Sequence, residues 1–176
     1  MSYAIVYDSS TGNTQRLACA VKEALPAEEV VAFGRVGDVD PAALVAADRV
    51  YAGFWTNRGD CTDQMAEVLS QLEGKEVFLF GTAGFGADQT YFAGVMARVA
   101  RHVPESAQLV GSFMCQGQMP ESVRTRYERT AQAQPAQAAR MQQHIENFNA
   151  AVGNPDDIAV AHTQEAVTTA TRLCGG

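Results

Sequence analysis

Residues 3–14 read YAIVYDSSTGNT, a run of β-branched and aromatic residues followed by a hydroxyl-rich loop with one glycine. The run is typical of a buried strand, and the apolar spacing over 17–25 is typical of a helix. A loop between a strand and a helix N-terminus is a common phosphate-binding position in open α/β sheets. Because the loop has no lysine or arginine, it favours one phosphate held by neutral donors over a metal-bound triphosphate. A turn that only caps the helix remains the alternative.

Strand-like and helical patterns alternate along the next hundred residues. Further strands are expected at 29–33, 49–54, 76–81 and 108–114, with helices at about 14–25, 41–44, 61–72 and 88–101. This alternation predicts a parallel sheet with helices on both faces. Right-handed crossovers favour the strand order 2-1-3-4-5, with a ligand site between strands one and three.

Three loops in register resemble those of the flavodoxin family. Ser9-x-Thr11-Gly12-x-Thr14 is similar to its phosphate loop, and the loops at 55–60 (WTNRGD) and 81–86 (GTAGFG) are similar to its two ring-binding loops. Since strand five lacks a long insertion, the chain resembles the short-chain class. The resemblance implies a flavodoxin-like three-layer α/β/α sandwich that binds FMN.

The resemblance also implies which residues surround that cofactor. They are Ser9, Ser10, Thr11, Gly12, Asn13, Thr14, Phe54, Trp55, Thr56, Asn57, Arg58, Gly59, Thr82, Ala83, Gly84, Phe85, Gly86, Tyr91 and Gln116.

Aromatic residues in these loops are expected beside the flavin ring. Trp55, the single tryptophan, is expected to stack on one face of the ring, with Phe85 or Tyr91 on the other. The alternative for Trp55 is a hydrophobic lid or a contact with a partner. Arg58 stands where flavodoxins often carry an acidic residue, and a cation there would stabilise the reduced, anionic flavin.

The chain continues beyond the fifth strand with helix-favouring sequence. Residues 115–120 (CQGQMP) are expected to approach the cofactor edge, followed by helices at about 121–133 and 136–150 and a last one reaching Leu173. We expect residues 1–150 to form the FMN-binding domain and residues 151–176 to form a helical extension packed on it. The 115–120 exit and the added helices resemble flavodoxin-family proteins that accompany bacterial bilirubin reductases.

Composition restricts the partners. The 176 residues carry 13 Lys and Arg against 20 Asp and Glu, a net charge of −7, with no basic cluster. Nucleic acid and anionic membranes are therefore not expected as partners. Acidic surfaces are compatible with docking onto a basic patch of a reductase. We expect a monomer or a weak dimer.

The four cysteines indicate a reducing compartment. Cys19, Cys61, Cys115 and Cys174 are far apart, and no Cys/His spacing predicts a metal site. With no secretory signal and no apolar run long enough to span a bilayer, we expect a cytoplasmic protein. If Asp60 caps the next helix, Cys61 would have a lowered pKa at the helix N-terminus. The alternative is a semi-buried structural thiol.

Other α/β functions lack their residues. A phosphoacceptor domain needs an aspartate at the end of strand three, where Gly53-Phe54-Trp55 stands, and no GxGxxG follows strand one. His102, His144 and His162 have no nucleophile pattern near them, so no catalytic residue is predicted. With these functions set aside, the flavodoxin resemblance implies an FMN electron carrier served by a flavoprotein or NAD(P)H reductase and delivering electrons to an acceptor reductase, one acting on bilirubin or another tetrapyrrole. An NAD(P)H-dependent FMN quinone reductase is the alternative.

Overall fold

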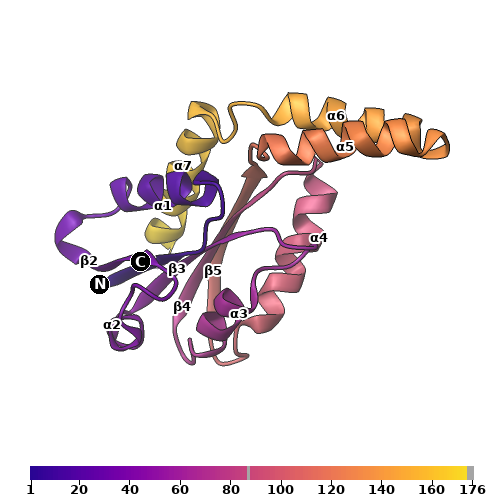
Figure 1. The fold of residues 1–176 in the computed structure, drawn as a ribbon. Coiled ribbons are helices and arrows are strands. Elements are labelled where there is room, and N and C mark those ends of the chain that lie inside the picture. Colours follow the sequence, from indigo (N-terminus) through magenta and orange to yellow (C-terminus); the bar gives the residue numbers. More distant parts are fainter. Residues whose placement is uncertain (87, 174–176) are drawn as a thin grey trace.

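A computed structural model describes residues 1–86 and 88–173 as a five-stranded parallel sheet (Figure 1). Its strands are β1 (Tyr3–Tyr7), β2 (Val30–Arg35), β3 (Arg49–Trp55), β4 (Glu76–Ala83) and β5 (Gln108–Gln116). The order is β2-β1-β3-β4-β5, which confirms the flavodoxin-like sheet. Cys174 lies outside the described residues.

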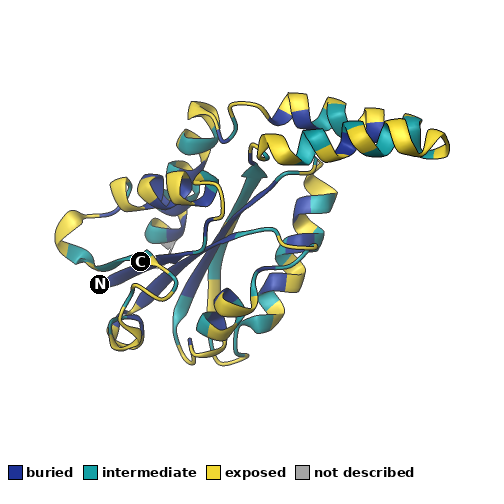
Figure 2. Cartoon of the chain, in the orientation of Figure 1, coloured by how far each residue is buried: buried dark blue, intermediate teal, exposed yellow. Residues whose placement is uncertain are grey.

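Helices cover both faces of the sheet. On one face, α1 (Asn13–Glu23) and α7 (Asp157–Leu173) pack on Ile5, Tyr51 and Phe78. On the other face lie α2 (Pro41–Ala46), α3 (Asp63–Ser70) and α4 (Gln89–Val99). Short 3₁₀ turns occupy Ala27–Glu29, Ala100–His102 and Pro135–Gln137. Figure 2 shows buried residues concentrated in the central strands β1, β3 and β4, as expected of a parallel sheet enclosed on both sides.

A helical hairpin stands outside these two layers. It consists of α5 (Glu121–Ala133) and α6 (Ala138–Ala151), which pack against each other beyond the carboxyl end of β5 (Figure 1). Its buried residues are Tyr127, Met141, Phe148 and Ala151. The hairpin therefore extends from the end of the sheet at which the predicted ligand loops emerge.

The last helix belongs to a sheet-covering layer. α7 packs on α1 and β5, and its Val167 and Ala170 are buried among core residues of the sheet. Residues 157–173 thus contribute to the same core as the first strands. The division of the chain at residue 150 remains a prediction.

Several strands run one or two residues further than the sequence predicted. Trp55 pairs with Thr82, and Ala83 pairs with Gln116, so these residues end strands rather than lie in loops. β2 continues through Gly34 to Arg35, two residues beyond the expected end at residue 33. The neighbouring strands continue the hydrogen-bonded ladder at each of these positions, which outweighs the local turn propensity.

Candidate functional site

The predicted loops meet at a cavity of about 820 Å³ at the carboxyl ends of β1, β3 and β4. Three loops, α4, the exit of β5 and α5 contribute its walls. The lining residues are Ser10, Thr11, Asn13, Trp55, Thr56, Asn57, Arg58, Gly59, Thr82, Ala83, Gly84, Phe85, Tyr91, Arg98, Gly117, Gln118, Met119, Pro120, Val123, Arg126 and Tyr127. The cavity thus lies at the switch point between β1 and β3, where open α/β sheets bind ligands.

The first loop offers neutral donors at the start of a helix. Gly12 is the N-cap of α1, has φ 89°, and no side chain caps the helix. Its own N–H donates to Ser9 Oγ at 3.0 Å, which closes the loop. The first backbone N–H groups of α1 remain available at the positive end of the helix dipole. This donor set fits a phosphate held without a lysine.

Two hydroxyls predicted to face the phosphate are used inside the protein. Thr14 is fully buried, and its Oγ1 lies 3.3 Å from the Phe54 carbonyl and 3.0 Å from Thr82 Oγ1. Ser9 is also buried. Thr14 therefore ties the start of α1 to the ends of β3 and β4, and so fixes the three loops relative to one another.

The second loop is a tight turn of two left-handed residues. Arg58 and Gly59 have φ of 51° and 86°, and Asn57 and Asp60 exchange backbone hydrogen bonds of 2.7 and 3.0 Å. This is the geometry of a type I′ turn, for which glycine at the second central position is favoured. Trp55 and Thr56 lead from β3 into it.

Two residues C-terminal to the turn hold it in place. Arg98 Nη1 on α4 donates to the Gly59 carbonyl at 2.8 Å, and His102 Nε2 lies 3.2 Å from both Asp60 carboxylate oxygens. Partial burial favours the neutral acid, but the Cys61 N–H and His102 together hold the pKa of Asp60 below its usual value. The loop is thus clamped from α4 and the turn after it.

Cys61 is not an activated thiol. Burial, followed by the nearby Asp60 carboxylate, raises the pKa of Cys61 to about 12. The helix is capped by Thr62, whose Oγ1 accepts from Met65 N at 3.3 Å, rather than by Asp60. The condition for a lowered pKa, a helix cap by Asp60, is therefore not met, and the interpretation of Cys61 as a structural thiol describes the site.

The fold also assembles a group that no sequence spacing indicated. The side chains of Asp60, Cys61 and His102 lie with one ligand atom each within 4.8 Å of one another. Because Cys61 and His102 are far apart in the sequence, only the packing of the 3₁₀ turn Ala100–His102 against α3 brings them together.

The third loop is held by the hairpin. Asn147 on α6 accepts from Gly86 N at 3.0 Å through Oδ1 and donates from Nδ2 to the Gly84 carbonyl at 2.9 Å. Gln116 Nε2 donates to the same Asn147 Oδ1 at 3.1 Å. Gln116 therefore supports the loop from behind and does not line the cavity.

Three aromatic rings in edge-to-face contact join the third loop to the hairpin. The His144 ring lies edge-on to Phe85 and to Tyr127, each at 5.0 Å between ring centroids. Burial, with Arg140 adding to it, lowers the pKa of His144. The neutral imidazole that results packs as an aromatic ring between two residues of the cavity wall.

Known proteins resemble this chain over most of its length. Residues 4–168 match the Flavodoxin domain family. The chain belongs to this family. It is 39% identical to the flavodoxin-like domain-containing protein BilS of Clostridium symbiosum, over 99% of this chain and 98% of the relative. A BilS protein of Clostridioides difficile is 25% identical, over 89% of each chain.

Solved structures share the flavodoxin fold at low identity. An archaeal flavodoxin superposes with a TM-score of 0.55 and 14% identity over 100% of both chains. The WrbA-like flavodoxin of Agrobacterium tumefaciens gives 0.52 and 18% identity, covering 97% of this chain and 98% of that one. At these identities the likeness concerns the fold alone.

The flavodoxin-like site collects most of the residues that the sequence predicted. Thirteen of the nineteen line the cavity, whereas Ser9, Gly12, Thr14, Phe54, Gly86 and Gln116 lie behind or beside it. Sequence reasoning missed Arg98, Val123, Arg126 and Tyr127. The residues of α5 could have been found from the expected topology, because a chain that leaves β5 at its carboxyl end begins its next helix beside the ligand loops.

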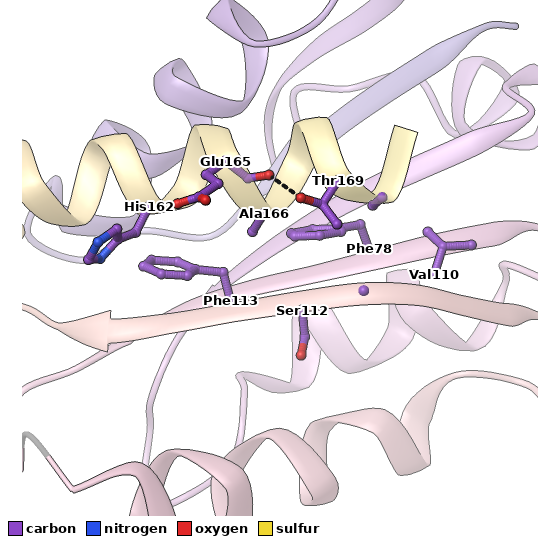
Figure 3. Close-up of a pocket in the computed structure, with 10 residues that line it drawn as sticks. Phe78, Val110, Ser112, Phe113, His162, Glu165, Ala166 and Thr169 are labelled. Carbon is purple, nitrogen blue, oxygen red and sulfur yellow. Dashed lines mark hydrogen bonds between the residues drawn. The ribbon is translucent and has the colours of Figure 1, made fainter. Parts of the chain in front are cut away.

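A second cavity of about 500 Å³ lies between α7 and the edge strand β5 (Figure 3). Phe78, Phe113 and Ala166 line it, and His162 and Glu165 stand on α7 beside it. None of the predicted cofactor residues contributes to it.

Among the described residues, no helix is both long and apolar enough to cross a membrane.

Proposed function

We propose that this flavodoxin-like protein binds FMN in the 820 Å³ cavity and carries electrons to a separate reductase. The convergence of three loops at the ends of β1, β3 and β4 is the observation that carries this proposal. When bound, FMN supplies the redox chemistry, and the protein contributes position and electrostatics.

The phosphate fits the first loop. Ser10, Thr11 and Asn13 line the cavity beside the uncapped start of α1. Arg35 donates to the Ser9 carbonyl at 2.5 Å and places a cation behind the loop. Neutral donors in front and one cation behind suit a single phosphate, which separates FMN from nucleotide triphosphates.

The ring fits between aromatic walls. Trp55 at the end of β3, Phe85 in the third loop and Tyr91 on α4 all line the cavity. We assign Trp55 to one ring face and Phe85 or Tyr91 to the other. Arg58 lies in the clamped turn, where its charge would favour the reduced, anionic ring and so raise the potential.

The acceptor is proposed from the resemblance to flavodoxin-family proteins that accompany bacterial bilirubin reductases. The 39% identity to BilS over 99% of this chain supports placing it in that group. We propose a reductase of bilirubin or another tetrapyrrole as electron acceptor, and a flavoprotein or NAD(P)H reductase as donor. We also propose that the protein is cytoplasmic, because Cys19, Cys61 and Cys115 are free thiols, as is usual in a reducing compartment.

A second candidate function is direct reduction of quinones with NAD(P)H. The cavity extends past the three flavodoxin loops to Val123, Arg126 and Tyr127, which wall a space beside the proposed ring position. Such a space could admit a small acceptor. The carrier is preferred because the described residues that line the cavity include no Asp, Glu, His or Lys that could exchange a proton with a small acceptor.

An anaerobic titration separates the two functions. The protein is saturated with FMN, reduced stepwise with dithionite and, in parallel, mixed with NADH or NADPH, while the visible spectrum is recorded. A carrier accepts electrons in two resolvable one-electron steps and is not reduced by NAD(P)H alone. Complete reduction by NAD(P)H would support the quinone reductase, and the absence of a bound flavin spectrum would contradict both.

A further inference from the structure

We propose that the mouth of the flavin cavity is a docking surface for an acidic redox partner, with Arg126 as its central contact. This inference rests on the proposed carrier function. The cavity is lined by three guanidinium groups, those of Arg58, Arg98 and Arg126, and by no carboxylate among the described residues. The protein as a whole has a net charge of −7, so the charge at the mouth is opposite to the charge of the molecule.

The three arginines come from separate elements around the opening. Arg58 stands in the turn after β3, Arg98 on α4 and Arg126 on α5, and each is exposed. None of them forms an ion pair within the described part of the chain. Their charges are therefore available to a partner that approaches the cavity.

The neighbouring arginine on α5 shows the contrast. Arg124 is paired with Glu128 at 3.0 Å and with Glu121 at 3.9 Å, so its charge is compensated on its own helix. Arg126, two residues further on, packs over the Tyr127 ring at 5.7 Å, and that ring is itself part of the cavity wall. The hairpin thus presents one uncompensated cation toward the flavin site.

The charges around the cavity mouth determine how a charged partner approaches it, because salt screens the more distant charges of the protein. At physiological salt the Debye length is about 8 Å, so a partner at the mouth responds to the nearest charges more than to the net charge. Asp60, the carboxylate nearest in sequence to Arg58, is occupied by His102. The side chains that line the opening therefore carry net positive charge, although 20 acidic residues outnumber 13 basic ones in the whole chain.

The placement favours a protein over a small molecule. The guanidinium groups are exposed on the rim, whereas Val123, Met119 and the buried Tyr127 form neutral walls. Exposed rim charges chiefly guide encounter, and arginine binds carboxylates in a planar, two-point geometry. A partner with carboxylates around its own redox centre matches this arrangement.

The first test measures electron transfer from the reduced, FMN-loaded protein to two inorganic acceptors of opposite charge. Ferricyanide is a trianion and hexaammineruthenium(III) a trication, and each takes one electron. We expect added NaCl to slow the ferricyanide reaction and to accelerate the ruthenium reaction. The opposite salt dependence, which the net charge would produce, would overturn the proposal.

A matched pair of variants locates the effect. Arg126→Glu and Arg129→Glu change the net charge equally at two exposed positions of α5, but only Arg126 lines the cavity. Arg126→Glu should slow ferricyanide about tenfold at low salt, whereas Arg129→Glu should change the rate less than twofold. Equal effects of the two substitutions on the ferricyanide rate would contradict a specific role of Arg126 at the cavity mouth.

A flavin-free measurement keeps the inference separate from the proposed function. Trp55 is the single tryptophan and lines the cavity, so its fluorescence reports on the mouth in the apoprotein. We expect iodide to quench Trp55 more efficiently than caesium, and Arg126→Glu to reduce or reverse that preference. Preferential quenching by caesium in the wild type would overturn the cationic mouth whether or not FMN binds.

Poly-L-glutamate distinguishes a protein surface from a small anion. The polymer should slow the ferricyanide reaction of the wild type and leave that of Arg126→Glu unchanged. If ferricyanide shows the expected salt dependence but poly-L-glutamate has no effect, the mouth selects small anions and the docking proposal is wrong.

Discussion

Asn147 on α6 donates from Nδ2 to the carbonyl of Gly84 at 2.9 Å, and so connects the added hairpin to the third loop of the 820 Å³ cavity. Its Oδ1 accepts from Gly86 N at 3.0 Å, so one amide side chain pairs with two backbone groups of the loop. The hairpin therefore does more than extend the fold, because it sets the conformation of the third loop.

Replacing Asn147 by alanine should weaken FMN binding. Two hydrogen bonds to the loop backbone are lost, which corresponds to about 1–3 kcal/mol at typical net values. Titration of the apoprotein with FMN, followed by flavin fluorescence, measures the change. Asn149→Ala is the matched control, because Asn149 is exposed on the same helix and contacts no flavin loop. Equal affinities of the two variants would contradict the role of Asn147.

Gly53→Ala should destabilise the protein by about 1–3 kcal/mol, because overpacking a tight core has this cost. A Cβ at Gly53 would overlap the ring of Phe80, its partner on β4. Urea unfolding measures the loss. Gly94→Ala on α4 is the control, since a Cβ there meets only Arg98 Nη2 at 3.9 Å and should be neutral or stabilising.

Cys61 should resist alkylation at pH 8 in the folded protein. Its pKa of about 12 leaves about one thiol in ten thousand ionised, and the side chain is buried. Cys19 is exposed and should react first. Mass spectrometry of peptides after iodoacetamide treatment identifies the modified thiols, and unfolding in urea should expose Cys61. Rapid modification of Cys61 in the folded state would show that the thiol is activated.

Asp60→Asn should lower stability at pH 7, and its effect should become smaller as the pH falls to 3. The folded protein holds the pKa of Asp60 below its usual value, so the carboxylate stabilises the fold above that usual value. This contribution is lost as the pH falls through the lowered pKa. Denaturant unfolding of both proteins at the two pH values measures it, and a difference that stays constant with pH would exclude a charge effect.

The sheet and most of the site could be predicted from sequence because their signals are local. Strand-like runs end at hydroxyl-rich or glycine-rich loops, and parallel strands bring those ends to one edge. Trp55 was therefore located correctly beside the cavity, although it ends β3 rather than standing in a loop.

The remaining part of the site depends on tertiary packing. No local pattern indicates that Thr14 Oγ1 points to Thr82 and not to solvent. Nor does helix periodicity in α5 fix the direction of the hairpin, which depends on its contacts through Tyr127 and Asn147. Arg126 enters the site only as a result of that direction.

The most direct measurement is a titration of the apoprotein with FMN and, separately, with riboflavin, in which Trp55 and flavin fluorescence are followed together. We predict saturation at one FMN per chain, with quenching of Trp55, and binding of riboflavin at least tenfold weaker because it lacks the phosphate. No saturable FMN binding would contradict the flavin site, and equal affinity for riboflavin would contradict the phosphate role of the loop at 9–14.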